Sequence, residues 1–154
     1  FSEASADKLY LPVIDDAEYT YKKVNVEAAE KDEHSLLHWM RMIIQLRAEH
    51  PTFGRGSFEF TNANHPSVLS YWREYTDDRI WVVINLSDMD QTVDVDLKKE
   101  GYDDVLEDLF TGDELNISNG TCSLELAPYQ YAWYAPKNLD MLTLVEKSMV
   151  MTMG

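Results

Sequence analysis

Hydrophobic positions between residues 36 and 49 recur with the spacing of one helical face. They follow the i, i+3, i+4, i+7, i+8 pattern, and Trp39 and Leu46 widen the face on either side. The five that define the pattern are Leu36, Leu37, Met40, Ile43 and Ile44. We predict a helix over residues 34–49, with Asp32 or Ser35 accepting hydrogen bonds from its first free backbone N–H groups. Pro51 ends the helix, because the residue before a proline is pushed out of the α region.

This apolar face is too broad for a helix surrounded by water, so it must be covered. One interpretation is that the helix packs on the β-domain that follows it in the chain, as layer packing favours. The other is that part of its covering partner lies outside these 154 residues. The sequence leaves both interpretations open.

After residue 53 the pattern changes to short segments with the period of a β-strand. Val93, Val95 and Leu97 alternate strictly with polar residues, so they face inward, whereas the nearly continuous apolar run at 79–85 indicates a strand buried on both faces. The predicted strands are residues 57–60, 67–75, 79–85, 91–97, 102–110, 114–117, 122–126 and 129–134. Seven or eight short strands at this spacing predict a mainly β fold, an antiparallel Greek-key sandwich preceded by one amphipathic helix.

Several details of that sandwich follow from local signals. Asn119-Gly120 predicts a tight hairpin between two of the strands. Gly54 and Gly56 predict a flexible turn between the helix and the first strand. In the strand at 102–110 we expect Val105 and Leu109 to face inward.

The two ends of the chain show no sustained period. Residues 1–31 predict an irregular loop segment, and residues 137–154 a poorly ordered tail or a short helix. The first residue is Phe1 rather than methionine, from which we expect the sequence to be a piece of a longer protein.

Composition excludes two classes of partner. The formal net charge is −15, which argues against nucleic acid and against an anionic membrane surface, because both require a basic patch. A single cysteine, Cys122, precludes an internal disulfide and fits a reducing cytoplasm, and its strand-like surroundings indicate a core residue. No apolar run approaches the roughly 20 residues that a membrane-spanning helix needs.

The carboxylates and histidines do not form a convincing reactive site. The acidic pairs at residues 15–16, 77–78 and 103–104 lie in turns or at strand ends, where Asp is solvated. His34 and His38 have an i, i+4 spacing that can bind zinc, but no third ligand is in view. We therefore predict no catalytic, cofactor-binding or metal-binding residue in this chain, and no cofactor.

Aromatic residues raise the question of sugar binding, because exposed rings can stack on pyranose sugars. Trp72, Trp81 and Trp133 all fall within predicted strands, where core packing is the default role. Core packing is therefore the favoured interpretation, and a carbohydrate-binding module is the alternative.

Several segments resemble the C-terminal part of the α-amylase superfamily of glycoside enzymes, glycoside hydrolase family 13. Within it they look most like the trehalose synthases, which interconvert maltose and trehalose. The segments lie at 1–2 (FS), 9–14 (LYLPVI), 24–28 (VNVEA), 34–47, 50–60 (HPTFGRGSFEF), 68–75 (VLSYWREY), 82–87 (VVINLS) and 126–134 (LAPYQYAWY).

The resemblance implies a role for each part of the chain. Residues 1–52 would be the end of a (β/α)8 barrel, a long loop followed by the last helix, and residues 53–136 the C-terminal β-sandwich, which packs on the barrel and stabilises it. Its principal partner would then be the catalytic barrel. Maltose or α-glucan, and a second copy bound through the helix face, are further expected partners.

The superfamily's three catalytic carboxylates lie, by this resemblance, on barrel strands upstream of Phe1. No catalytic residue is carried over, and we expect the chain alone to be inactive although the parent protein is an enzyme. Two alternatives stay open: a free-standing carbohydrate-binding sandwich, or the C-terminal domain of another α-glucosidase or α-amylase.

Overall fold

The computed structural model describes residues 6–8, 10–11, 17–98 and 104–137. The chain divides into two compact units, Phe1–His50 and Pro51–Gly154. The expectation for residues 138–154 lies outside the described residues.

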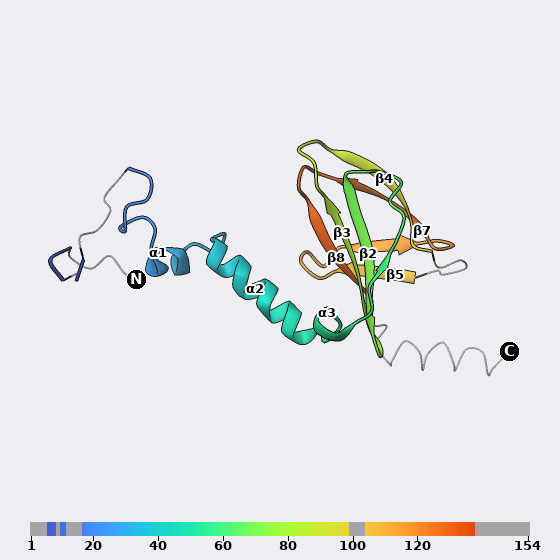
Figure 1. The fold of residues 1–154 in the computed structure, drawn as a ribbon, viewed down its shortest axis with the longest axis horizontal. Coiled ribbons are helices and arrows are strands. Elements are labelled where there is room, and N and C mark those ends of the chain that lie inside the picture. Colours follow the sequence, from blue (N-terminus) through green and yellow to red (C-terminus); the bar gives the residue numbers. More distant parts are fainter. Residues whose placement is uncertain (1–5, 9, 12–16, 99–103, 138–154) are drawn as a thin grey trace, which may run out of the picture. The chain divides into compact units, whose positions relative to one another are not determined.

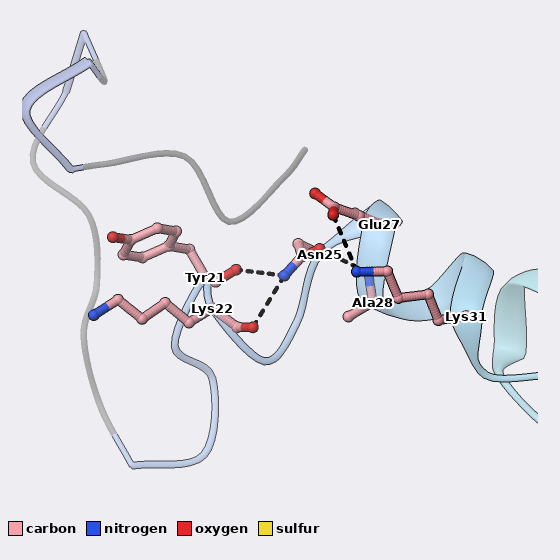
Figure 2. Close-up of polar contacts among 6 residues, drawn as sticks. All are labelled: Tyr21, Lys22, Asn25, Glu27, Ala28 and Lys31. Carbon is pink, nitrogen blue, oxygen red and sulfur yellow. Dashed lines mark hydrogen bonds and ion pairs between the residues drawn. The ribbon is translucent and has the colours of Figure 1, made fainter.

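The first unit contains a short helix that the sequence analysis did not predict. Helix α1 (Val26–Lys31) follows a single 3-10 turn at Ala6–Lys8. Asn25 caps α1: its Oδ1 accepts from the Ala28 N–H at 2.8 Å, and its Nδ2 donates to the carbonyls of Tyr21 and Lys22 (Figure 2). A Glu27–Lys31 ion pair of 3.1 Å closes one turn of the helix. The prediction of an irregular segment is therefore wrong for these six residues.

Helix α2 (Leu36–Glu49) confirms the predicted helix, although it begins two residues later than expected. Ser35 is the N-cap: its Oγ accepts from the His38 N–H and donates to the carbonyl of Ala29 at 2.6 Å. The helix ends at Glu49, just before Pro51, as predicted.

The second unit is an antiparallel β-sandwich, as predicted. Six strands form one sheet in the order β1-β2-β3-β8-β5-β6, and β4 and β7 form the other (Figure 1). The strands are β1 (Glu59–Phe60), β2 (Val68–Tyr75), β3 (Asp78–Asn85), β4 (Gln91–Asp96), β5 (Asp104–Asp108), β6 (Glu114–Ile117), β7 (Thr121–Leu126) and β8 (Tyr131–Pro136).

The core lies between the two sheets. Val93, Val95 and Leu97 are buried, as the alternation predicted, and β3 is buried on both faces over Ile80 to Val83. Trp72 and Trp81 lie in the core, and the Trp81 indole N–H donates to Ser70 Oγ at 2.8 Å. A buried tryptophan usually donates its indole N–H to an acceptor, as Trp81 does here.

The Asn119-Gly120 hairpin is confirmed. Both residues have positive φ, 49° and 73°, which is the conformation of a type I′ turn. The expectation for β5 is wrong: Leu106 and Asp108 face the core, while Val105 is only half-buried. A shift of one residue moves every side chain of a strand to the other face.

A one-turn helix, α3 (Thr52–Arg55), replaces the expected flexible turn before β1. The Thr52 N–H donates to the Asp78 carboxylate at 3.1 Å. A Cβ on Gly56 would lie 2.5 Å from the Thr52 carbonyl oxygen, so only glycine fits where α3 turns into β1.

The last strand begins two residues later than the predicted 129–134. Residues 127–130 form a turn instead, closed by the Gln130 N–H donating to the Ala127 carbonyl at 3.0 Å. Tyr129 has a φ of +57° in this turn.

Candidate functional site

The apolar face of α2 is the largest feature of the first unit that packing within the chain does not explain. In the described chain none of the 14 residues of α2 is buried. Leu36, Met40 and Ile44, which succeed one another at four-residue intervals, are 71%, 41% and 59% exposed. A row of large apolar side chains in water is typical of an interaction surface.

In the second unit a row of apolar side chains crosses the face of the six-stranded sheet that is turned away from the core, and its middle is covered, since Val82 is only 1% exposed. Strand register places Phe60 opposite Tyr71, Tyr71 opposite Val82, and Val82 opposite Trp133. Residues paired in this way project from the same face of a sheet. An apolar row therefore runs across four strands from β1 to β8.

The two ends of this row differ in how well they are covered. At the β8 end, Trp133 is half-buried against Phe53 and Phe110, with ring centroids 4.4 Å and 4.9 Å away. At the β1 end, Phe58 stacks on Tyr71 at 4.5 Å and meets Phe60 edge to face at 4.8 Å, yet Phe58 and Phe60 remain 51% and 56% exposed. We call Phe58, Phe60 and Tyr71 the aromatic edge.

Sequence reasoning did not single out the aromatic edge. The alternation Phe58-Glu59-Phe60 could have indicated it, since alternating residues place their side chains on one face of a strand. The sequence does not show whether that face is turned toward the core or toward solvent.

The predicted ionisable candidates do not come together as a reactive centre. Among the described residues there is no group of three or more His, Cys, Asp or Glu side chains placed to hold a metal ion. His34 and His38 line an open hollow of about 450 Å³ at the start of α2, with Glu33, Ser35, Trp39 and Met42. His38 Nε2 lies 3.1 Å from the Glu30 carbonyl oxygen, which ties it to α1.

Cys122 and the acidic pair at residues 77–78 lie where the sequence predicts them. Cys122 is buried, as predicted, and burial together with the nearby Asp94 raises the pKa of its thiol to about 12. Residues 77 and 78 form the β2–β3 connection and the start of β3, as their turn signal indicated, whereas 15, 16 and 103 lie outside the described residues. Within the described part of the chain, no helix is long and apolar enough to cross a membrane.

Comparison with known proteins identifies the class. Residues 58–133 match the family described as Maltogenic Amylase, C-terminal domain. The chain is 47% identical over 103 residues to a trehalose synthase of Pimelobacter sp. (strain R48), covering 64% of this chain and 18% of that protein. It is 36% identical over 142 residues to a trehalose synthase of Thermus thermophilus, covering 91% of this chain and 14% of that protein.

The fold agrees with this class. The crystal structure of AmyP in complex with maltose superimposes with a TM-score of 0.60 at 21% identity, covering 78% of this chain and 23% of that one. The family match and the trehalose synthase relatives show that the chain belongs to the α-amylase superfamily, glycoside hydrolase family 13, as part of its C-terminal region. Its relatives include trehalose synthases, so the resemblance found in the sequence is confirmed. The chain spans less than a fifth of the length of each of these two trehalose synthases.

Proposed function

We propose that this chain is the non-catalytic C-terminal part of an enzyme that interconverts maltose and trehalose, and that it stabilises the catalytic barrel by packing on it. Residues 1–52 are the end of that barrel, residues 53–136 its C-terminal β-sandwich, and residues 137–154 a tail. The observation that carries the proposal is the α2 helix, none of whose 14 residues is buried in the described chain.

The energetics of α2 support a covering partner. Fully burying a side chain such as Leu36, Met40 or Ile44 stabilises by about 1.5–3 kcal/mol. An isolated helix of this length is marginal in water, and most helix stability in proteins comes from tertiary packing. Helix α2 therefore requires an apolar neighbour, and the last helix of a barrel has one in the adjoining barrel strands and helices.

The aromatic edge gives the sandwich a second apolar surface for the same partner. Phe58 and Phe60 are held in place by Tyr71 and by Arg73, whose guanidinium lies 6.0 Å from the Phe58 ring centre. Rings that are fixed before docking lose little conformational freedom when they are covered. We propose that the aromatic edge contacts the barrel.

The proposed substrates are maltose and trehalose, with α-glucan as a further ligand, and the proposed reaction is an isomerisation in the cytoplasm. The relatives' names support trehalose, and the maltose complex of the structurally similar AmyP supports maltose. The single thiol, Cys122, supports the cytoplasm. The catalytic carboxylates belong to the barrel, so this chain by itself is proposed to be inactive.

A chimera tests the proposal. In the Thermus thermophilus trehalose synthase, the 142 matched residues are replaced by this chain, and conversion of maltose to trehalose is followed by NMR. We expect the chimera to convert maltose while the chain alone does not. Turnover by the chain alone would contradict the proposal, because it would place catalytic groups among residues 1–154.

Self-association is the main competing explanation of the α2 face. Light scattering on the chain alone distinguishes a dimer, which would cover α2 with a second copy, from a monomer. Two results together would favour self-association over packing on the barrel as the role of α2. One is a dimer of the chain alone that persists at nanomolar concentration, and the other is a chimera that does not convert maltose.

A further inference from the structure

Two arginines near the boundary of the two units have no acceptor within the described chain. Arg47, in the last turn of α2, and Arg55, the last residue of α3, are both exposed. Neither side chain makes a hydrogen bond or an ion pair with a residue that the structure describes. The other arginines have acceptors, which are Glu30 for Arg41, Glu74 for Arg79 and backbone carbonyls for Arg73. An exposed arginine is ordinary in itself, and it is the surroundings of these two that single them out.

Arg47 continues the apolar row of α2. Leu36, Met40 and Ile43 succeed one another at intervals of four and three residues, and the same spacing leads next to Arg47. Residues three and four apart lie on one face of a helix, so a partner that covers the row also covers Arg47. Taking a guanidinium out of water without an acceptor is strongly unfavourable. A surface that fits this row therefore presents an acceptor to Arg47.

Arg55 lies beside a stretch of backbone that another segment can approach closely. Gly54 precedes it in α3, does not have a positive φ, and a Cβ there would meet nothing within 4 Å. Glycine lowers the stability of a helix relative to alanine. Gly56, by contrast, is required, since a Cβ at that position would lie 2.5 Å from the Thr52 carbonyl oxygen. Packing within the described chain therefore does not account for Gly54, whereas close approach of a partner's backbone does.

The partner that these features fit is the barrel rather than a second copy of the chain. Only His50 and Pro51 separate α2 from α3, so a body that covers the 14 residues of α2 is also within reach of Arg55. Two copies of a chain with a net charge of −15 repel each other over most of their surfaces. The chain matches only 18% and 14% of the two trehalose synthases, and the rest of such an enzyme is large enough to be that body.

The acceptor that suits an arginine best is a carboxylate. The guanidinium is planar and binds a carboxylate through two parallel hydrogen bonds, which fixes the orientation of the two groups as well as attracting them. We propose that Arg47 and Arg55 each bind a carboxylate of the barrel, and that these two ion pairs set the position in which the chain docks on it. This inference rests on the function proposed above. It adds charged groups of the barrel to the apolar contacts of α2 and the aromatic edge.

The test is the thermal midpoint of the Thermus thermophilus chimera carrying single substitutions. Arg47→Met and Arg55→Met remove the charge and keep a long side chain. Each should lower the midpoint by about 3 °C or more, because the facing carboxylate loses its partner. Arg41→Met is the control, since Arg41 pairs with Glu30 within the chain, and it should shift the midpoint by about 1 °C or less. In the 154-residue chain alone, Arg47→Met and Arg55→Met should leave the midpoint unchanged.

The dependence on pH identifies the acceptor. Protonation of the carboxylates removes the ion pairs from the unchanged chimera, so the deficit of both variants should shrink as the pH is lowered from 7 to about 4.5. A deficit that stays the same over this range would overturn the proposal, because it would indicate backbone carbonyls as the acceptors. Either variant melting at or above the midpoint of the unchanged chimera would also overturn it, because the guanidinium would then extend into water.

Ile44→Asp, which puts a charge on the apolar face of α2, separates the ion pairs from the docking itself. A chimera that is destabilised by Ile44→Asp but not by Arg47→Met keeps the docking and overturns the ion pairs alone. A chimera that tolerates both substitutions overturns the docking as well. If the Thermus thermophilus chimera does not fold, the same substitutions are made in a chimera of the Pimelobacter sp. enzyme, which is 47% identical over 103 residues. Failure of both chimeras to fold would overturn the docking and the ion pairs together.

Discussion

The guanidinium of Arg73, on β2, donates through Nη2 to the Gly56 carbonyl at 3.0 Å, seventeen residues earlier in the chain. The same nitrogen lies 3.2 Å from the carbonyl oxygens of Thr52 and Phe53. Arg73 thus bonds the carbonyl oxygens of Phe53 and Gly56 at the end of the one-turn helix, and it shares the Thr52 carbonyl oxygen with the Gly56 N–H. It fixes the segment by which the chain enters the sandwich.

Replacing Arg73 by alanine is therefore expected to destabilise the second unit. The free energy of unfolding should fall by about 2–4 kcal/mol, because three carbonyls lose a charged donor. Chemical denaturation measures this change. Arg79→Ala is the control: its ion pair with Glu74, at 3.0 Å, is only half-buried, so the loss should be about 1 kcal/mol or less. Equal losses for both variants would show that Arg73 does not hold α3.

Asn85 is expected to be the most sensitive polar residue of the sandwich. Its side chain bonds to the carbonyls of Met89, Leu126 and Ala127 and accepts from both the N–H and the hydroxyl of Ser87. Asn85→Ala should cost about 3 kcal/mol or more, since several buried groups lose their partner. Ser87→Ala should cost only about 1 kcal/mol. Urea denaturation measures the free energy of unfolding of both variants. A loss for Asn85→Ala no larger than that for Ser87→Ala would contradict the prediction.

Asp108 should make the stability of the sandwich depend on pH. Burial raises the pKa of its carboxyl group, although the Phe110 N–H donates to it at 3.0 Å. A raised pKa in the folded state means that the protonated form favours folding and that this contribution is lost as the pH rises through the folded pKa. Asp108→Asn, which keeps the acceptor oxygen, should therefore be more stable than the unchanged chain at pH 7.

The advantage of Asp108→Asn should shrink as the pH falls to the ordinary range of an aspartate. Thermal unfolding of both proteins from pH 7 downward tests it, with Asp77→Asn as the matched control on an exposed carboxylate of the β2–β3 turn. A difference that stays constant with pH would argue against ionisation of Asp108 as the cause.

Cys122 should be unreactive in the folded chain. Only the thiolate attacks thiol reagents, and burial raises the pKa of this thiol to about 12, far above neutral pH. Modification by a thiol reagent at pH 8 should therefore be very slow in buffer and complete within minutes in denaturing urea. Rapid reaction in buffer would mean that β7 opens readily from the rest of the sandwich.

Strands with a clean alternation could be predicted from the sequence, and strands without one could not. Val93, Val95 and Leu97 fixed the inward face of β4 correctly. In β5, Val105 and Leu106 are adjacent, so the pattern offers two registers. The pairing of Leu106 with Pro136 on β8 decides between them, and that contact spans thirty positions of sequence.

Features that depend on neighbouring residues could be predicted, and features that depend on distant contacts could not. The apolar face of α2 could be predicted from its helical period, because all of its residues are close together in the sequence. Helix α3 was not visible, since Arg73 holds it from a distant strand. Tyr129 was assigned to a strand because the run 129–134 is rich in aromatic residues, and the Pro128 turn that exposes it becomes apparent only in three dimensions.

The most direct test of the proposed docking role compares two single substitutions in the Thermus thermophilus chimera. Ile44→Asp places a charge on the exposed apolar face of α2, and Gln45→Asp places the same charge one residue away on the polar face. If the barrel covers Ile44, burying the charge should cost more than about 3 kcal/mol, lowering the thermal midpoint and maltose conversion. Gln45→Asp, which loses only an exposed hydrogen bond to Glu49, should lower both far less. Equal losses in the two chimeras would contradict the proposed docking of α2 on the barrel.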